Sequence, residues 1–406
     1  MNPLLVIKAT ILRHRGTYLL FVLLVAVATS IGVGITAQET ALRVGSARAA
    51  DKFDLVIAAP GSETDVVLAA IYLRPGTVPL LQPAVVAKAF ADPHAKIAAP
   101  LGFGDSIRGS PIVGSVAGFV DYLSGGLQDG RVFASESEGV AGAATPVAVG
   151  ESFHPVHGLH DEDDDDEDEH EHHEHENTIT VVGRMKPTGT PWDNSVIVPI
   201  ESVWHVHGLP TGHAEGDTRI GPPFESDRVP GVPAIIIKPD TLAAAYTLRN
   251  AYRTPLSMAF FPAEALVRLY EVLGNIRELM SWVAIGAQGL VVVAMLAGVM
   301  AILTLHRRQF GVLRALGAPR LYVFLCVWGQ TAFIAVAGAL LGLALGTGAV
   351  VVVSHMITRA TGIALPARIG SNELLLVGGM ILFGLLVSTV PAYIIHRRPV
   401  IQALTA

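Results

Sequence analysis

Cysteine is almost absent from this sequence. Cys326 is the single cysteine among 406 residues, so no intramolecular disulfide can form and an exported domain must hold together through its own core. Charged residues are also scarce at 16% of the chain, whereas hydrophobic residues reach 51%. This balance is unlike that of ordinary soluble domains, and it indicates a membrane protein.

A phosphate-binding loop is also missing. No lysine follows glycine in the pattern G-x-x-x-x-G-K-[S/T], whose backbone N–H groups and lysine hold the phosphates of ATP. We therefore expect no ATPase site in this chain, and nothing in its charge pattern suggests a nucleic-acid partner.

Four apolar segments are long enough to span a bilayer, which requires about 20 helical residues. They contain no acidic or basic side chain and cover residues 18–37, 282–305, 321–346 (extending as far as 353) and 374–395. Basic residues flank them at three places, and the positive-inside rule puts all three in the cytoplasm: Lys8, Arg13 and Arg15; Arg307, Arg308, Arg314 and Arg320; Arg397 and Arg398. The first segment is longer than a typical signal-peptide core and has a poor cleavage pattern, so we interpret it as a retained anchor.

This topology exports one large loop and one short loop. The large loop, residues 38–275, has an α/β pattern: strands are predicted over 53–59, 178–183, 194–199 and 232–238, and helices over 64–73 and 240–252. Its length suggests two subdomains, the second over about 101–215. Residues 263–305 contain no proline and would form a helix of about 64 Å, longer than a bilayer, whose excess is a stalk under the domain.

The most unusual stretch of the chain is 160–176. It packs twelve carboxylates and five histidines into seventeen positions, and without those carboxylates the formal net charge would be about +5 instead of −7. Imidazole and carboxylate are common zinc ligands, so we predict a Zn²⁺-binding loop over 154–176, although a solvated acidic linker is the alternative. The candidate ligands are the histidines in and around the loop: His154, His157, His160, His170, His172, His173, His175, His205 and His207.

Small residues recur every four positions in two of the predicted spans. Gly338, Gly342 and Gly346 do so in the third span, and Ala28, Gly32 and Thr36 in the first. Because this spacing lets helix backbones approach closely in lipid, both stripes are candidate helix contacts, within one subunit or between two.

Residues 306–320, His-Arg-Arg-Gln-Phe-Gly-Val-Leu-Arg-Ala-Leu-Gly-Ala-Pro-Arg, predict a short cytoplasmic helix with apolar side chains between arginines. Such a face needs a partner. The segment resembles the coupling helix of MacB/FtsX-type ABC permeases, whose pattern is close to R-R-x-E-I-G-x-L-R-A-L-G-A, although Gln309 stands where that family usually has an acidic residue. The C-terminal Pro391-Ala-Tyr-Ile-Ile-His-Arg-Arg-Pro-Val-Ile-Gln-Ala-Leu404 is also similar to that family. Within the resemblance, the residues expected to contact an ATPase are Phe310, Val312, Leu313, Arg314 and Leu316.

Further motifs of one branch of these permeases lie in the exported loop: Ala59–Ser62, Pro100–Asp105, Val182–Pro191 and Val198–Trp204. The resemblance implies an α-helical membrane protein of the bacterial inner membrane with four transmembrane helices and a large α/β periplasmic domain inserted between helices 1 and 2, and both termini in the cytoplasm. It also implies a homodimer, ATP bound by a separate ABC ATPase subunit, a periplasmic partner protein and contact with membrane lipid. The resulting order is 1–37 (N-terminal segment and first span), 38–275 (periplasmic domain), 276–305 (stalk end and second span), 306–320 (coupling helix), 321–353 (third span), 354–373 (short periplasmic loop), 374–395 (fourth span) and 396–406 (cytoplasmic tail).

Three functions fit this reading. The first is a permease subunit that transmits ATPase motion to its periplasmic domain and acts on a periplasmic or membrane cargo such as a lipid, lipoprotein or small amphiphile. The second is a permease for zinc or another divalent metal, which is disfavoured because the spans offer only Gln288, Gln330 and hydroxyls as polar groups. The third is an FtsX-like signalling subunit that activates a periplasmic partner.

Overall fold

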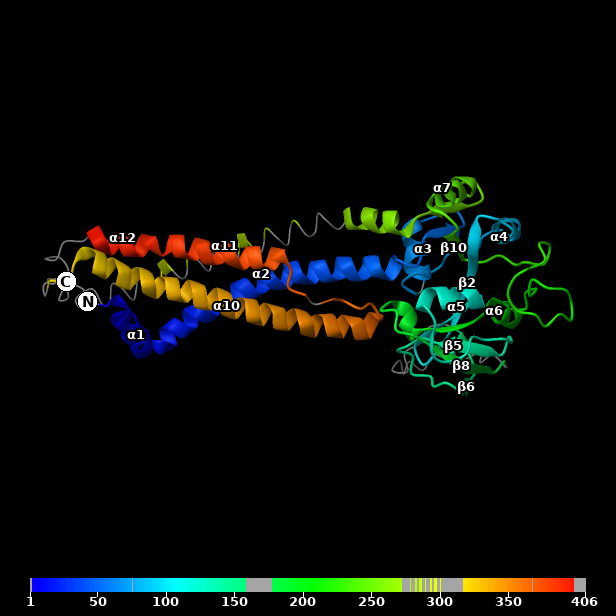
Figure 1. The fold of residues 1–406 in the computed structure, drawn as a ribbon, viewed down its shortest axis with the longest axis horizontal. Helices are drawn as coiled ribbons and strands as arrows, with labels where there is room; N and C mark the ends of the chain where they lie inside the picture. The colour runs from blue at the N-terminus through cyan, green and yellow to red at the C-terminus, as the bar shows by residue number, and fades with distance from the viewer. Residues whose placement is uncertain are drawn as a thin grey trace, which may run out of the picture. The chain divides into compact units, whose positions relative to one another are not determined.

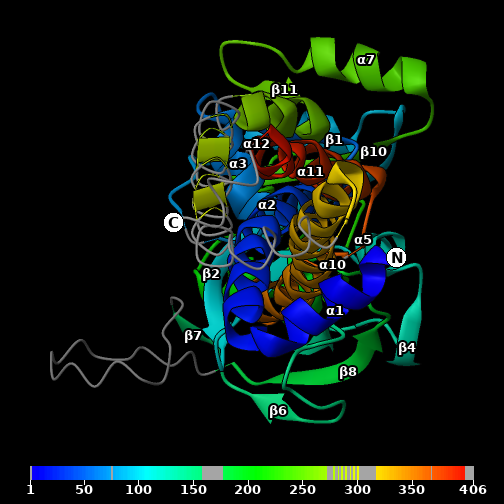
Figure 2. The same cartoon turned by 90° about the vertical axis from the view of Figure 1, so that its left-hand side faces the viewer.

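The computed structural model describes residues 2–74, 76–157, 177–271, 317–366 and 368–397, together with scattered single positions between 278 and 300. It divides into two compact units. The helical unit comprises Met1–Arg43, Leu273–Met356 and Leu365–Ala406, and the α/β unit comprises Val44–Val272 and Ile357–Ala364. Figures 1 and 2 draw the elements of each unit.

The described part of the helical unit is built from α1 (Pro3–Arg13), α2 (Arg15–Ala50), α10 (Arg320–Thr361), α11 (Ser371–Val387) and α12 (Thr389–Arg397). Asn2 caps α1 by accepting a hydrogen bond from the backbone N–H of Leu4. Within the described residues, three helical stretches are long and apolar enough to cross a membrane: Arg15–Ala50, Arg320–Thr361 and Ser371–Tyr393. They coincide with the first, third and fourth predicted spans, whereas the second lies largely outside the described residues.

α2 and α10 lie side by side (Figures 1 and 2) and pack closely where glycines of α10 meet α2. A Cβ placed on Gly342 would lie 2.5 Å from Thr29 Cβ and 2.6 Å from the carbonyl oxygen of Ala26. Gly338 and Gly346 are equally close to Val25 and Val33. The glycine stripe therefore contacts α2 within one chain, along residues 25, 29 and 33 instead of the small-residue stripe 28, 32 and 36.

The α/β unit is organised around a mixed sheet. Its described strands are β1 (Leu55–Ala58), β2 (Ala95–Ile107), β3 (Ser110–Ser115), β4 (Leu127–Gly130), β5 (Glu138–Ala141), β6 (Ser152–Phe153), β7 (Val156–His157), β8 (Ile179–Met185), β9 (Val196–Pro199), β10 (Ala234–Pro239) and β11 (Met258–Phe260). The strand order is β11-β1-β10-β2-β3-β9-β5-β8-β4, with β6 on β8 and β7 on β2. Strands occur at all four predicted positions, as β1, β8, β9 and β10, and the other strands of the sheet, β2 to β7 and β11, are additional.

Helices cover both faces of the sheet. They are α3 (Glu63–Ala70), α4 (Pro83–Phe90), α5 (Ala117–Ser124), α6 (Ile200–Val206) and α7 (Leu242–Ala251), with a single 3₁₀ turn, η1, at Pro191–Asn194. Successive side chains of β1 alternate between the faces: Val56 packs in the cluster that contains α3 and α5, while Leu55 and Ile57 pack in the cluster that contains α4, α6 and α7. Two buried apolar layers therefore enclose the sheet.

The expected subdomain boundary near residue 101 falls inside β2. This thirteen-residue strand pairs with β10 through Leu101 and with β3 from Gly102 onward. The sheet is thus continuous through that position, and residues 44–272 form one compact unit.

Candidate metal centre

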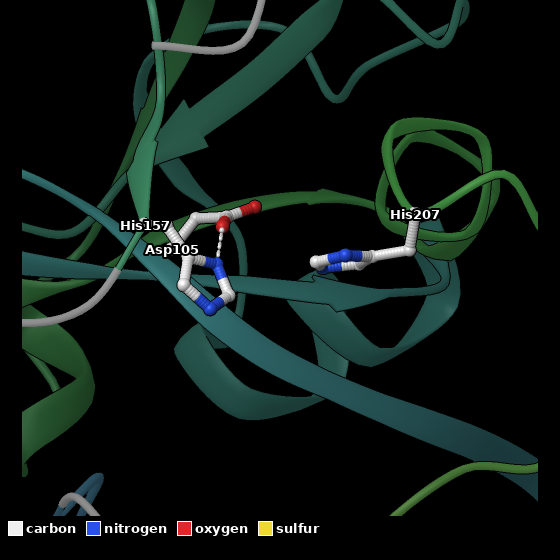
Figure 3. A group of neighbouring side chains, drawn as sticks. All are labelled: Asp105, His157 and His207. Carbon is white, nitrogen blue, oxygen red and sulfur yellow. Dashed lines mark hydrogen bonds and ion pairs between the residues drawn. The ribbon is translucent and has the colours of Figure 1, made fainter. Parts of the chain in front are cut away.

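Asp105, His157 and His207 converge at one edge of the α/β unit (Figure 3). Asp105 lies in β2 and is the direct register partner of His157 in β7. His207 ends α6, where its backbone N–H bonds to Val203. Three segments that are distant in sequence therefore bring two imidazoles and one carboxylate together.

A bulge in β2 helps to shape this site. The pairing of β2 with β3 shifts between Gly102 and Asp105, and Gly104 between them has φ +150°, a conformation that favours glycine. A Cβ on Gly104 would lie 3.7 Å from both His157 Cε1 and His207 Nε2. The Gly104 backbone thus forms the floor beneath the two rings.

The geometry suits a divalent transition metal such as zinc. Asp105 Oδ1 lies 3.3 Å from His157 Nδ1, the two imidazole centroids are 5.9 Å apart, and the three potential ligand atoms lie within 4.8 Å of one another. Ligands at ~2.0–2.1 Å from a tetrahedral zinc ion lie about 3.3 Å apart, so binding requires the widest of these separations to shorten by up to about 1.5 Å. His157 is 62% exposed and His207 is exposed, so both rings have room to turn, whereas the 5% exposed carboxylate of Asp105 is fixed.

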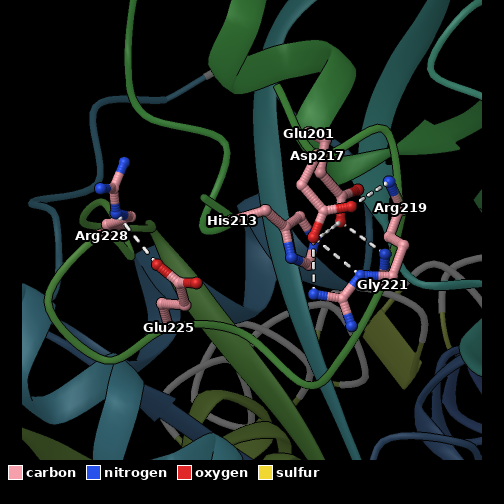
Figure 4. A network of polar contacts seen from close by, with 7 residues as sticks. All are labelled: Glu201, His213, Asp217, Arg219, Gly221, Glu225 and Arg228. Carbon is pink, nitrogen blue, oxygen red and sulfur yellow. Dashed lines mark hydrogen bonds and ion pairs between the residues drawn. The ribbon is translucent and has the colours of Figure 1, made fainter. Parts of the chain in front are cut away.

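A second histidine–carboxylate pair is buried near the start of α6 (Figure 4). His213 Nε2 lies 3.3 Å from Glu201 Oε1, which also accepts a hydrogen bond of 2.5 Å from the Gly221 N–H. Both side chains are 1% exposed, and burial raises the pKa of the Glu201 carboxyl. The pair fastens the loop after α6 to the helix, and the His213 ring stacks on Phe224 at 5.2 Å.

The end of α10 makes a defined contact within the α/β unit. Gly362, with φ +71°, terminates the helix, and a Cβ there would lie 2.9 Å from Pro191 Cα. The Ala364 N–H donates a 3.0 Å hydrogen bond to the Gly189 carbonyl oxygen. Residues 362–364 therefore form a junction with the loop that precedes η1.

That loop is braced by a buried carboxylate. Asp193 accepts hydrogen bonds from the N–H groups of Thr188 and Gly189, at 2.8 and 2.7 Å, and from Thr188 Oγ1 at 2.7 Å. It is 7% exposed. The junction therefore has a firm surface on the α/β side.

Comparison with known families gives a match over the C-terminal part of the chain. Residues 282–400 match the FtsX-like permease C-terminal model. This part of the chain is therefore the C-terminal domain of an FtsX-like permease. Such a permease is a membrane component of an ABC transporter and works with an ATPase subunit.

Two other comparisons add little to this membership. The extracellular domain of the ABC-type transporter YknZ from Gram-positive bacteria is similar at 11% identity and a TM-score of 0.29, over 51% of this chain and 98% of that chain. At that score the likeness carries no argument here. A search of curated proteins finds no match.

The structure brings some of the predicted metal ligands together and places others apart from them. His157 and His207 meet, and Asp105 joins them. His154 is exposed outside this cluster, and His205 Nδ1 lies 2.9 Å from Glu136 Oε2. The other predicted ligands lie outside the described residues: His160, His170, His172, His173 and His175.

The candidate ligands named from the sequence did not include Asp105, although it ends the motif Pro100–Asp105. The signal was a lone aspartate after a Gly-x-Gly stretch in an otherwise apolar strand, a pattern in which a charged side chain needs a partner. The predicted ATPase contacts also fall outside the described residues: Phe310, Val312, Leu313, Arg314 and Leu316.

Proposed function

We propose that this FtsX-like permease transmits conformational change from a separate cytoplasmic ATPase to its α/β unit. In this proposal the α/β unit is periplasmic, both termini are cytoplasmic, and two copies of the chain work together in the bacterial inner membrane. The single observation that carries the proposal is α10, which runs unbroken from the helical unit into the α/β unit and ends on the braced loop at Gly189.

The length of α10 exceeds what membrane crossing requires. Its 42 residues extend about 63 Å, whereas the hydrocarbon core is ~30 Å thick. α2, with 36 residues, also continues past its apolar window into the α/β unit. Such continuous helices suit a protein that transmits movement, because backbone hydrogen bonds make a helix stiff along its axis.

The partner contact in this scheme is the 306–320 segment. Phe310 and Leu313 are the apolar side chains that we assign to a groove on the ATPase, with Val312, Arg314 and Leu316 supporting them. The sequence of this segment places apolar side chains between arginines, which supports the assignment, since an apolar helix face is costly without a partner.

A metal-linked role is the second component of the proposal. The Asp105/His157/His207 cluster supports zinc binding at the α/β unit, with the histidines of 160–176 adding further ligands. Within the described residues this is the cluster with metal-binding spacing, and it lies in the α/β unit. In the helical unit the buried Gln330 side chain instead accepts a hydrogen bond from Tyr18. We therefore favour zinc as a regulator or structural ion over zinc as cargo. The alternative function, a signalling subunit that activates a periplasmic partner, differs from this proposal only in that no substrate is moved.

Hydrogen exchange on the complete ABC complex tests the transmission proposal. The permease and its ATPase are reconstituted together in nanodiscs, and exchange is compared between the nucleotide-free state and the state trapped with ADP and vanadate. We expect altered protection at 186–191 and 362–364, because the junction is where α10 meets the braced loop.

The uncoupled control is the double substitution Phe310→Asp and Leu313→Asp. It should reduce ATPase copurification, because it places charge at an apolar contact, and it should abolish the nucleotide-dependent exchange change. If vanadate trapping left the α/β unit unchanged in a complex that hydrolyses ATP normally, the transmission proposal would be wrong.

A further inference from the structure

A cavity of about 360 Å³ lies between the end of α3 and the β2–β3 hairpin of the α/β unit. This volume falls in the range of ~300–1,000 Å³ that small-molecule sites occupy. Its wall is mainly apolar, formed by residues that include Leu73, Val78, Leu80, Phe103 and Ile112. The cavity can therefore accept an apolar group.

The segment that covers the cavity holds unusual features. Leu73 has φ +50°, a left-handed and strained conformation that leucine rarely adopts. Leu80, further along the same segment, is 58% exposed although it lines the cavity. A strained turn and an uncovered leucine at one opening are typical of a surface that a ligand completes.

The charge at the opening indicates what that ligand carries. Arg74 lines the cavity, is exposed, and forms no ion pair with any residue that the structure describes. The acidic group in the wall, Asp105, instead directs Oδ1 toward His157 at 3.3 Å. A guanidinium is therefore available to an anion beside an apolar cavity.

We propose that this cavity binds a single-chain amphiphile with an anionic head group, its tail among Leu73, Val78 and Phe103 and its head at Arg74. This assignment rests on the proposed function in one respect, because it names the class of cargo that the transporter would handle. Binding itself requires no ATPase and no nucleotide.

Photolabelling of the full chain in lipid nanodiscs tests this site. The probe is a fatty acid that carries a diazirine in its chain, and the fatty alcohol with the same chain is its neutral twin. Adducts are mapped by mass spectrometry after digestion, so probe dissolved in the lipid does not obscure the result. We expect adducts within 69–80 and 103–112, about tenfold more with the acid than with the alcohol.

Two variants and one matched control sharpen the test. Arg74→Gln should lower labelling by the acid about tenfold, toward the level of the alcohol, because a charge-assisted hydrogen bond is lost. Val78→Trp should lower labelling by both probes, because it fills the cavity. Arg228→Gln, which changes another exposed arginine of the same unit, should change neither.

Three results would overturn the proposal. They are adducts absent from both segments, equal labelling by acid and alcohol, and undiminished acid labelling of Arg74→Gln. Because no ATP is present in the labelling experiment, these results would not bear on the transmission proposal. In the same way, an unchanged α/β unit in the vanadate experiment would not bear on amphiphile binding.

Discussion

Two histidine–carboxylate constellations involve the two ends of α6, and they differ in their access to water. Asp105, His157 and His207 form an open group in which both imidazoles are exposed. Glu201 and His213 form a sealed pair in which both side chains are 1% exposed. Histidine and carboxylate side chains therefore occur both in an exposed group and in a buried pair within a few residues of one another.

The difference teaches how burial divides the roles of histidine. An exposed imidazole can turn to meet an ion, so the open group is the one to which we assign metal binding. The sealed pair is locked between the Gly221 N–H and the Phe224 ring, so its value is structural. Distance alone does not distinguish them, because the nearest histidine–carboxylate separation is 3.3 Å in both.

The largest expected effect comes from opening the sealed pair. Glu201→Ala should lower the free energy of unfolding by about 3–5 kcal/mol, because it leaves the buried His213 ring and the partly buried Gly221 N–H without their acceptor. Asp105→Ala should cost less than about 1 kcal/mol, because water can reach exposed His157 in its place. Chemical denaturation of the full chain in nanodiscs, followed by tryptophan fluorescence, measures both. Equal losses would remove the distinction between the two constellations.

Zinc affinity gives the next largest effect and tests the open group. The measurement is calorimetry on the full chain with His160, His170, His172, His173 and His175 changed to Ser, so that the fixed site is observed alone. In this background His207→Gln should weaken zinc binding by about 10- to 100-fold, because one of three ligands is lost.

His205→Gln is the matched control for that experiment. It changes a neighbouring exposed histidine whose Nδ1 faces Glu136, and it should leave zinc affinity unchanged. If the variant with the five serines bound no zinc, the open group would not be a metal site, and any zinc binding by the wild-type chain would be assigned to the 160–176 segment.

The smallest effect is a pH dependence of the sealed pair. Burial raises the pKa of the Glu201 carboxyl above its ordinary value of 4.5. The folded state therefore binds the carboxyl proton of Glu201 more tightly than the unfolded state does. Its contribution to stability is complete below pH 4.5 and is lost as pH rises through the folded pKa, by about 1.4 kcal/mol for each pH unit in that window. Glu201→Gln, which is neutral throughout, should flatten this part of the stability profile; a Gln variant with an unchanged slope would assign the pH dependence to another group.

The sequence predicts much of the fold but only part of the site. Apolar runs without charge predicted three spans that the structure contains, and the β-branched run Ile235–Ile237 predicted a central strand, because both signals are local. The pairing of Asp105 with His157 depends on strand register between positions 52 residues apart, which no local pattern encodes. For the same reason His205 and His207 looked equivalent, although the end of α6 sends one toward Glu136 and the other toward the open group.

The length of α10 has a mechanical consequence. From Gly342 to Thr361 the helix forms an arm of about 19 residues, or about 29 Å, so a tilt of ~5° about the glycine contact moves its end by about 2.5 Å. Angular changes too small to break the tight packing of Gly338, Gly342 and Gly346 on α2 would still move residues 362–364 by about that distance. In the proposed transmission the narrow glycine contact would be the pivot, and the braced loop at Asp193 would receive this displacement.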